Sequence, residues 1–362
     1  MAPPTDPSPP PSKNLEAADA TTLDNLDLRG TLPAAASGRL LGAHAGVVHS
    51  VHLQAGQAPS YRSRQVRAVV GTDTAASDTF VFGGSILAFG HESLAHELSS
   101  ELDTVRSVDL AGQSRRLSAC PKHDPITGDL HLLAATADGT QAHVLVSSGA
   151  LTRRSRLLLD APNEVADLAI TRDHLVFVAD GFVGVTSRDS EARIIWIPTG
   201  VDAPVPVHAH DNAGAIVMYA ITPSLERWTL NIGAATVRRD LLDTAPRRFA
   251  RTSDHQLDGA PRFLWTIGDG TADTHDLSAG SHVQHDFGQR QPGDLVFVPD
   301  PARPHDADGG WLVGFIHGAS GDGTDLVVLD AADISRPAVA AVRIPRRIPP
   351  ELHTTWIPST NQ

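Results

Sequence analysis

Residues 227–242 read RWTLNIGAATVRRDLL, and this stretch indicates how most of the chain folds. Two runs of alternating polar and apolar residues flank Asn231–Ala234, where Asn and Gly favour a tight turn. The pattern therefore predicts a β-hairpin. Residues 275–288, HDLSAGSHVQHDFG, predict another hairpin around a Ser-Ala-Gly-Ser turn.

The same pattern extends along the chain from about residue 39, as short apolar or alternating runs separated by Gly, Asp, Asn, Pro or Ser. The clearest runs are GVVHSVHL (46–53), DTFVFGGSILAF (78–89), DLHLLAAT (129–136), AHVLVS (142–147), HLVFVA (174–179), RIIWIP (193–198), AIVMYAI (215–221), DLVFVP (294–299), WLVGFIH (311–317) and DLVVLD (325–330). Every run has the length of a strand, and no long helical period interrupts them. About two dozen strands without βαβ alternation favour an all-β propeller, because radial blades protect many strand edges. At about 40–50 residues per blade, the length allows six to eight blades.

Composition narrows the class of protein. The 362 residues are 41% hydrophobic and 20% charged, which is typical of a soluble globular protein, and the net charge of -13 argues against a nucleic-acid partner. A single cysteine excludes an internal disulfide and suits a reducing compartment, so we expect a cytoplasmic protein. No apolar run is long enough for a transmembrane helix. The proline-rich start predicts a disordered tail over residues 1–25, followed by one propeller domain over residues 26–362.

Two groups of residues are candidates for a metal site. Cys120 and His123 lie in ACPKHDP (119–125), where the alternatives are metal ligands or a strand that enters a turn. His208 and His210 flank Ala209, so on a strand they share one face; the alternative is a pair on an exposed loop. Because the chain has 18 histidines, chance clusters are common, and we expect His123 to face solvent.

Eight stretches between Leu28 and Pro358 carry a family resemblance through their order and spacing. They are LRGTLPAAASGRLLG (28–42), GVVHSVHLQAGQAPSYRSRQVRA (46–68), ACPKHDPITGDLHLL (119–133), EVADLAITRDHLVFV (164–178), RWTLNIGAATVRRDLLDTAPRRFAR (227–251), HDFGQRQPGDLVFVPDP (285–301), DGGWLVGFIHGASGDGTDLVVLDAADI (308–334) and RIPRRIPPELHTTWIP (343–358). In this order they resemble the carotenoid cleavage oxygenases, which include retinoid-isomerising and stilbene-cleaving relatives. The resemblance implies a seven-bladed β-propeller with Fe(II) held on its axis by four histidines. It also implies a hydrophobic tunnel in which dioxygen cleaves an alkene of a long conjugated substrate to two carbonyl products.

The family's four iron ligands can be placed one by one on this sequence. The histidine of the motif A-H-P-K-x-D-P corresponds to Cys120, and that of M-H-D-F-A-I-T corresponds to Ala166. The third, before an Asn-Ala pair, corresponds to Ala209, and the fourth survives as His353 in LHTTWIP. A shift of one residue could bring His208 or His210 to the third position, but only with a bulge, because neighbouring strand residues face opposite sides.

The glutamates that the family uses to hold its ligands correspond to His91, Arg248 and Asp294. Only Asp294 keeps a carboxylate, and a guanidinium at Arg248 in a dry shell would repel a dication. Inner and outer positions have therefore changed together, and we expect the iron site not to be maintained.

Two hypotheses follow for function. By resemblance, the chain is a non-haem Fe(II) dioxygenase acting on a carotenoid, apocarotenoid or stilbene-type alkene, with a rearranged site that uses His353 and His208 or His210. From the residues, we favour the alternative of a catalytically inactive propeller that binds an apolar ligand or a protein partner. A softer zinc or copper site of Cys120, His123, His353 and Asp294 is a third, weaker interpretation.

Overall fold

The computed structural model describes residues 20–67, 76–90, 94–110, 116–117, 121–135, 139–147, 151–188, 193–253, 259–318 and 323–359. Over these residues the only helical element is a 3-10 turn, η1 (Ala34–Ala36), and all other regular structure is strand. None of the described residues forms a helix that is long and apolar enough to span a membrane.

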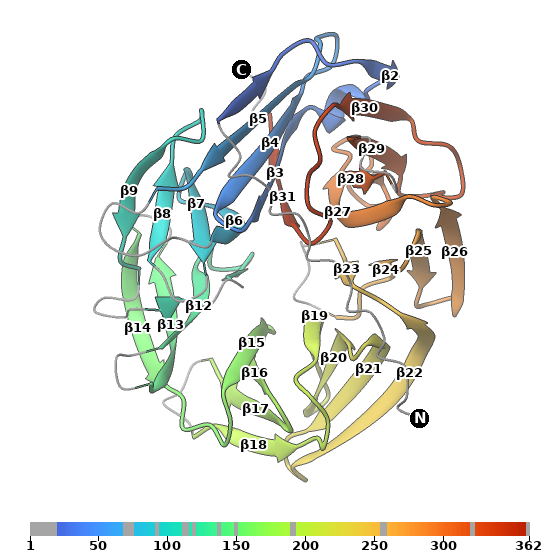
Figure 1. The fold of residues 1–362 in the computed structure, drawn as a ribbon. Helices are drawn as coiled ribbons and strands as arrows, with labels where there is room; N and C mark the ends of the chain where they lie inside the picture. Colours follow the sequence, from blue (N-terminus) through green and yellow to red (C-terminus); the bar gives the residue numbers. More distant parts are fainter. Residues whose placement is uncertain are drawn as a thin grey trace, which may run out of the picture.

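Within the described chain, seven antiparallel sheets surround a central axis, and each is one blade of a β-propeller (Figure 1). Blade 1 contains β1 (Thr21–Leu23), β5 (Ser60–Gln65), β4 (Val47–Leu53), β3 (Gly38–His44) and β31 (His353–Pro358). Blade 2 contains β6 (Ala76–Phe82), β7 (Ser85–Gly90), β8 (Ala95–Leu98) and β9 (Thr104–Val108). Blade 3 contains β10 (Arg116–Leu117), β11 (Lys122–His123), β12 (Leu130–Ala135), β13 (Gln141–Ser147) and β14 (Thr152–Leu158).

The remaining four blades follow in chain order. Blade 4 contains β15 (Val165–Ile170), β16 (His174–Ala179), β17 (Phe182–Ser187) and β18 (Ile195–Pro198). Blade 5 contains β19 (Val205–Asn212), β20 (Ala215–Ile221), β21 (Ser224–Asn231) and β22 (Thr236–Pro246). Blade 6 contains β23 (Phe249–Arg251), β24 (Phe263–Ile267), β25 (Thr271–Asp276) and β26 (Ser281–Asp286). Blade 7 contains β27 (Gln291–Pro299), β28 (Gly310–His317), β29 (Thr324–Asp330), β30 (Ala340–Ile344) and β2 (Leu28–Gly30).

The ring closes through strands from the two ends of the described chain. The C-terminal strand β31 pairs with β3, with Ala43 opposite His353, and completes blade 1 on its axial side (Figure 1). The second strand, β2, pairs with β30 at the outer edge of blade 7, with Leu28 opposite Val342. Segments from both ends of the described chain therefore complete blades 1 and 7 and hold these two blades together.

A cluster of buried apolar residues lies at each of the seven interfaces between neighbouring blades. Successive residues of one strand serve different interfaces: Leu40 packs between blades 1 and 7, and Leu41 packs between blades 1 and 2. Because both faces of each sheet are covered, the inner strands read as continuous apolar runs. Each fully buried leucine contributes about 1.5–3 kcal/mol.

The structure confirms the seven-bladed propeller and both hairpins. The first hairpin turns at residues 232–235, where the Asn231 side chain accepts a hydrogen bond from the Ala234 N–H at 2.9 Å. Residues 277–280 form the second turn. The first strand begins at Thr21, before the predicted domain boundary at residue 26, and residues 1–19 of the predicted tail lie outside the described chain.

Candidate functional site at the propeller axis

Polar side chains from the innermost strands of six blades interact at the axis. We call them the axial cluster: Asp78 of β6, Lys122 of β11, Asp167 of β15, Arg251 of β23, Asp294 of β27 and His353 of β31. Ion pairs join two pairs of them, and the rest are within electrostatic range of these pairs. Positions as distant in sequence as 78 and 353 meet here because each blade starts or ends at the axis.

The best-connected member of the axial cluster is Asp294, which is only 1% exposed. Its carboxylate forms an ion pair with Arg251, whose Nε lies 3.0 Å from Oδ1. It also accepts hydrogen bonds from the Thr354 N–H at 2.9 Å and the Thr354 hydroxyl at 3.2 Å. Burial alone would raise the pKa of Asp294, but Arg251 and Thr354 outweigh it and hold the pKa below its usual value. The carboxylate therefore links blades 6, 7 and 1 as a charged group.

The second ion pair joins Lys122 of blade 3 to Asp167 of blade 4, with 3.2 Å between Nζ and Oδ1. Asp167 is buried, and its side chain also accepts a hydrogen bond from the Leu168 N–H at 2.7 Å. Sequence reasoning did not single out either residue, although both lie in motif stretches that carried the resemblance. Both could have been identified from their positions, because Lys122 lies two residues after Cys120 and Asp167 directly follows Ala166, and Cys120 and Ala166 are family ligand positions.

Asp78 is the titratable carboxyl of the axial cluster. Part of its surface stays accessible, but the surrounding protein desolvates it and raises its pKa to about 7. A hydrogen bond from the Thr79 N–H at 2.7 Å and the charges of Arg251 and Lys122 oppose this shift, while the charge of Asp294 adds to it. Sequence reasoning missed Asp78, since it appeared only as the first residue of a strand run.

His353 begins β31 and is exposed, although nearby protein atoms partly desolvate its ring. Desolvation lowers its pKa, and Arg251 and Lys122 lower it further, although Asp294 and Asp167 pull the other way. The ring packs edge-on against Phe249, with 5.3 Å between ring centroids. Burial and the neighbouring cations therefore favour the uncharged imidazole, the form that binds metals.

His208 and His210 lie on strand β19 and are buried, with 9% and 6% of their surface exposed. The exposed-loop interpretation is therefore wrong, since β19 is packed between neighbouring blades. The prediction that the two share a face is confirmed, because their ring centroids are 5.6 Å apart. The His208 Nε2 lies 3.0 Å from the Gly259 carbonyl oxygen, and burial lowers the pKa of His208 to about 4.

The two alanines at family ligand positions lie in different surroundings. Ala209 is 2% exposed and packs in the apolar cluster between blades 4 and 5, opposite in direction to the two flanking histidines. The register of β19 shifts between Pro206 and His208, which places a bulge before Ala209. Ala166 is exposed at a second register shift, between Val165 and Asp167. Neither alanine has a side chain that can bind a metal.

The other sequence candidates have mixed outcomes. Arg248 is exposed, so the expectation of a guanidinium in a dry shell is wrong; it donates to the backbone carbonyl of Pro292. His123 is exposed, as predicted, with its ring beside those of Phe80 and Phe82. Cys120 and His91 lie outside the described residues, so their proposed roles stay predictions.

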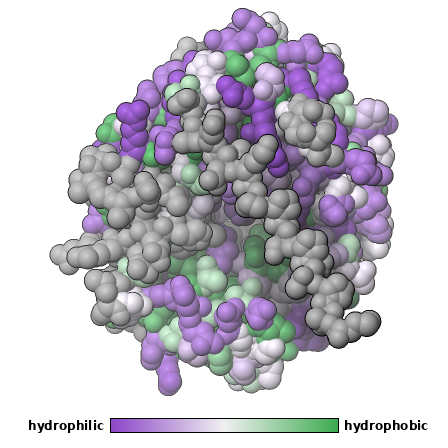
Figure 2. Space-filling model, in the orientation of Figure 1, coloured by the Kyte–Doolittle hydropathy of each residue, from purple (hydrophilic) through white to green (hydrophobic). Residues whose placement is uncertain are grey.

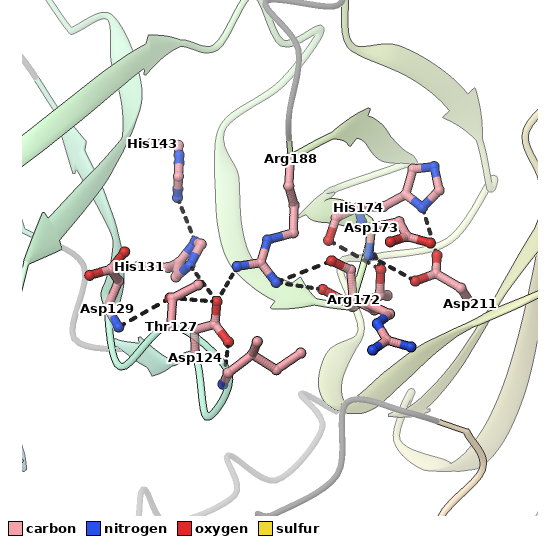
Figure 3. Close-up of polar contacts among 12 residues, drawn as sticks. Asp124, Thr127, Asp129, His131, His143, Arg172, Asp173, His174, Arg188 and Asp211 are labelled. Carbon is pink, nitrogen blue, oxygen red and sulfur yellow. Dashed lines mark hydrogen bonds and ion pairs between the residues drawn. The ribbon is translucent and has the colours of Figure 1, made fainter.

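The part of the ACPKHDP motif after the cysteine has a structural role, which Figure 3 shows. Asp124 is fully buried and accepts hydrogen bonds from the Ile126 N–H and the Thr127 hydroxyl, each at 2.8 Å, and from Arg188 of the next blade. Burial would raise the pKa of Asp124, but these donors lower it. Beside it, His131 and His143 are hydrogen-bonded at 3.0 Å. The motif thus joins blades 3 and 4 whether or not a metal is present.

These residues do not fit an iron held by four imidazoles. Within the described part of the chain, no three His, Cys, Asp or Glu side chains are arranged to hold a metal ion. The two axial carboxylates Asp167 and Asp294 are each paired with a fixed cation, which would also repel a dication. The predicted metal-ligand set of Cys120, His208, His210 and His353 includes a residue outside the described chain, Cys120, and stays a prediction.

Comparison with known proteins identifies relatives of this chain. The family profile described as retinal pigment epithelial membrane protein matches residues 43–218 and 202–358. The chain is 24% identical over 437 aligned positions to a carotenoid cleavage oxygenase of Mycobacterium tuberculosis, covering 87% of each chain. It is 26% identical to apocarotenoid-15,15'-oxygenase of Synechocystis, covering 76% of this chain and 71% of that one.

Solved structures agree in fold. Lignostilbene dioxygenase of Pseudomonas brassicacearum superposes with a TM-score of 0.86 at 19% identity, over 96% of this chain and 97% of that chain. A Trp149Ala variant of Synechocystis apocarotenoid oxygenase gives a TM-score of 0.85 at 18% identity, over 95% and 97% of the two chains. With the profile match over most of its length, the chain belongs to the retinal pigment epithelial membrane protein family, that is, the carotenoid cleavage oxygenases.

Proposed function

We propose that this chain is a ligand-binding member of the family that does not cleave its ligand by iron chemistry. The observation that carries the proposal is the donor set at the family ligand positions. Ala166 and Ala209 offer no donor, and among the described ligand positions His353 alone keeps an imidazole. One or two protein ligands would hold Fe(II) only weakly, because affinity depends on the number and geometry of donors.

The ligand class that we propose is an apolar conjugated molecule of the kind named for the relatives, a carotenoid, apocarotenoid or stilbene. Support comes from two aromatic contacts: Phe249 packs against His353 of the axial cluster, and Phe80 packs against His123, the residue after Lys122. Figure 2 shows a face whose rim is mainly hydrophilic, with hydrophobic residues near its recessed centre. Aromatic and apolar walls with a few polar groups are typical of small-molecule sites.

Metal content and ligand binding test the proposal separately. The protein would be loaded with Fe(II) without oxygen, desalted and analysed for iron, alongside the His353→Ala variant. We expect much less than one iron per chain, with no difference between the two proteins. A tryptophan-quenching titration with an apocarotenal should saturate, and should weaken several-fold in Phe249→Ala because that variant removes an aromatic wall.

Stoichiometric iron that disappears in His353→Ala would sink the proposal and favour the rearranged dioxygenase. So would two carbonyl products formed from the apocarotenal in air by wild type but not by this variant. Absence of saturable quenching would remove the apolar ligand while leaving the iron result intact.

A further inference from the structure

A cleft of about 440 Å³ lies between blades 6 and 7, and none of the residues that define the axial cluster lines it. Its walls come from the ends of several strands and the loop before β31: Asp269, Gly270, Gly288, Gln289, Arg290, Gln291, His317, Gly318, Gly323, Arg347, Ile348 and Pro350. This volume is within the range of about 300–1,000 Å³ that small-molecule sites occupy. We call it the Arg347 cleft.

His317, the last residue of β28, is the buried polar group of this cleft. It is 7% exposed, and neither Nδ1 nor Nε2 has a hydrogen-bond partner among the described residues. The Ile348 backbone is close enough to raise the pKa of the ring slightly, but neither ring nitrogen meets the distance and angle of a hydrogen bond. A buried polar atom left without a partner costs about 1–3 kcal/mol, and native proteins rarely keep two of them in one ring. A bound ligand would remove this cost.

The charges around the cleft are mainly positive. Arg290 and Arg347 line the cleft together with His317. Burial lowers the pKa of His317 to about 4, and the guanidiniums of Arg248, Arg290 and Arg347 lower it further. The cleft also contains one acid, Asp269, which is exposed and acts electrostatically on Arg248, as the exposed Glu351 does.

Arg290 shares its counter-ion with two other cations. The buried Asp325 carboxylate pairs with Arg290 at 3.0 Å, with Arg29 at 3.1 Å and with Arg343 at 3.1 Å. One carboxylate therefore faces three guanidiniums, and one of these, Arg290, lines the cleft. This local grouping of arginines contrasts with the chain as a whole, whose net charge is -13.

We propose that the Arg347 cleft binds the carboxylate or phosphate group of a small organic anion, with Arg347 and Arg290 as charge partners and the His317 ring as a hydrogen-bond donor. Guanidiniums bind both oxyanions through paired N–H groups. Four glycines in the walls leave the backbone accessible to such a ligand. The proposal does not depend on whether the axis binds iron.

Calorimetric titration with two probes, benzoate and inorganic phosphate, tests the proposal at low ionic strength. Arg347→Gln should weaken binding at least tenfold, whereas Arg346→Gln, an exposed neighbour outside the cleft, should stay within twofold. His317→Leu should weaken binding at least fivefold without lowering the unfolding midpoint, because it removes two unpartnered nitrogens. A lower midpoint in this variant would assign His317 a structural role instead.

Binding of benzoate alone would assign the cleft to a carboxylate, binding of phosphate alone to a phosphate, and binding of both to oxyanions in general. Equal weakening by Arg347→Gln and Arg346→Gln would mean that only diffuse charge attracts the probes, which overturns the site. So would the absence of saturable binding of both probes to the wild type.

Discussion

Replacement of Asp294 by asparagine tests whether the axial ion pair holds three blades together. The variant keeps the shape of the side chain and an acceptor for the Thr354 N–H, but leaves the Arg251 guanidinium without its carboxylate. Removing one partner of a buried pair costs about 3–5 kcal/mol. Because the Arg251 side chain is 28% exposed and partly solvated, we expect the lower end, about 3 kcal/mol.

Urea unfolding followed by tryptophan fluorescence measures this loss, with Asp240→Asn as the matched control. Asp240 pairs with Arg227 at 3.0 Å on the surface, where such pairs contribute at most about 1 kcal/mol. The folded pKa of Asp294 lies below its unfolded value, so its contribution is complete above about pH 4 and is lost as the pH falls through the folded pKa. The two proteins should therefore converge in strongly acidic solution. A loss below 1 kcal/mol at pH 7, or a difference that does not shrink in acid, would refute the reasoning.

Three further predictions concern the cluster, a turn and the core. Burial raises the folded pKa of Asp78 to about 7, so the stability of the wild type falls as the pH rises from about 4 through 7. In urea unfolding, Asp78→Asn should therefore be about 2 kcal/mol more stable than the wild type at pH 8 and equally stable at pH 4. Ala213 has a φ of 46° in the turn before β20, so Ala213→Gly should gain about 1 kcal/mol, and an unchanged thermal midpoint would contradict this. Leu312 is fully buried between blades 6 and 7, so Leu312→Ala should lose about 3–5 kcal/mol, whereas Leu241→Ala at an exposed position should change little in the same urea assay.

Much of the fold was predictable from local pattern. The run DTFVFGGSILAF (78–89) corresponds to β6 and β7 around Gly83 and Gly84, which both have positive φ. A hairpin is decided by neighbouring residues, so its signal is present in a short window. Ring closure cannot be predicted from a short window, because the pairing of β31 with β3 joins residues from opposite ends of the chain. The number of blades was implied only by the family resemblance.

The site was less predictable, for two physical reasons. Burial of His208 and His210 depends on the blade that packs against β19, and alternation along one strand cannot show what covers each face. The axial cluster combines single residues from six blades, so no spacing in the sequence links Asp78 to Arg251. In contrast, the sequence alone shows that alanine occupies two of the positions that match family ligands, Ala166 and Ala209.

Interactions that the polypeptide itself supplies link the inner strands at the axis. The Asp294 carboxylate ties blades 6, 7 and 1, the Lys122–Asp167 pair ties blades 3 and 4, and Asp124 with Arg188 ties those two blades again. If metal ligands were the main link between inner strands, their replacement by alanine would loosen the centre of the ring. Because these links are present, a ligand position can become Ala209 and be absorbed into an interblade core at little cost to the fold. The links that Asp124, Lys122 and Asp294 supply therefore do not depend on which side chain occupies a family ligand position.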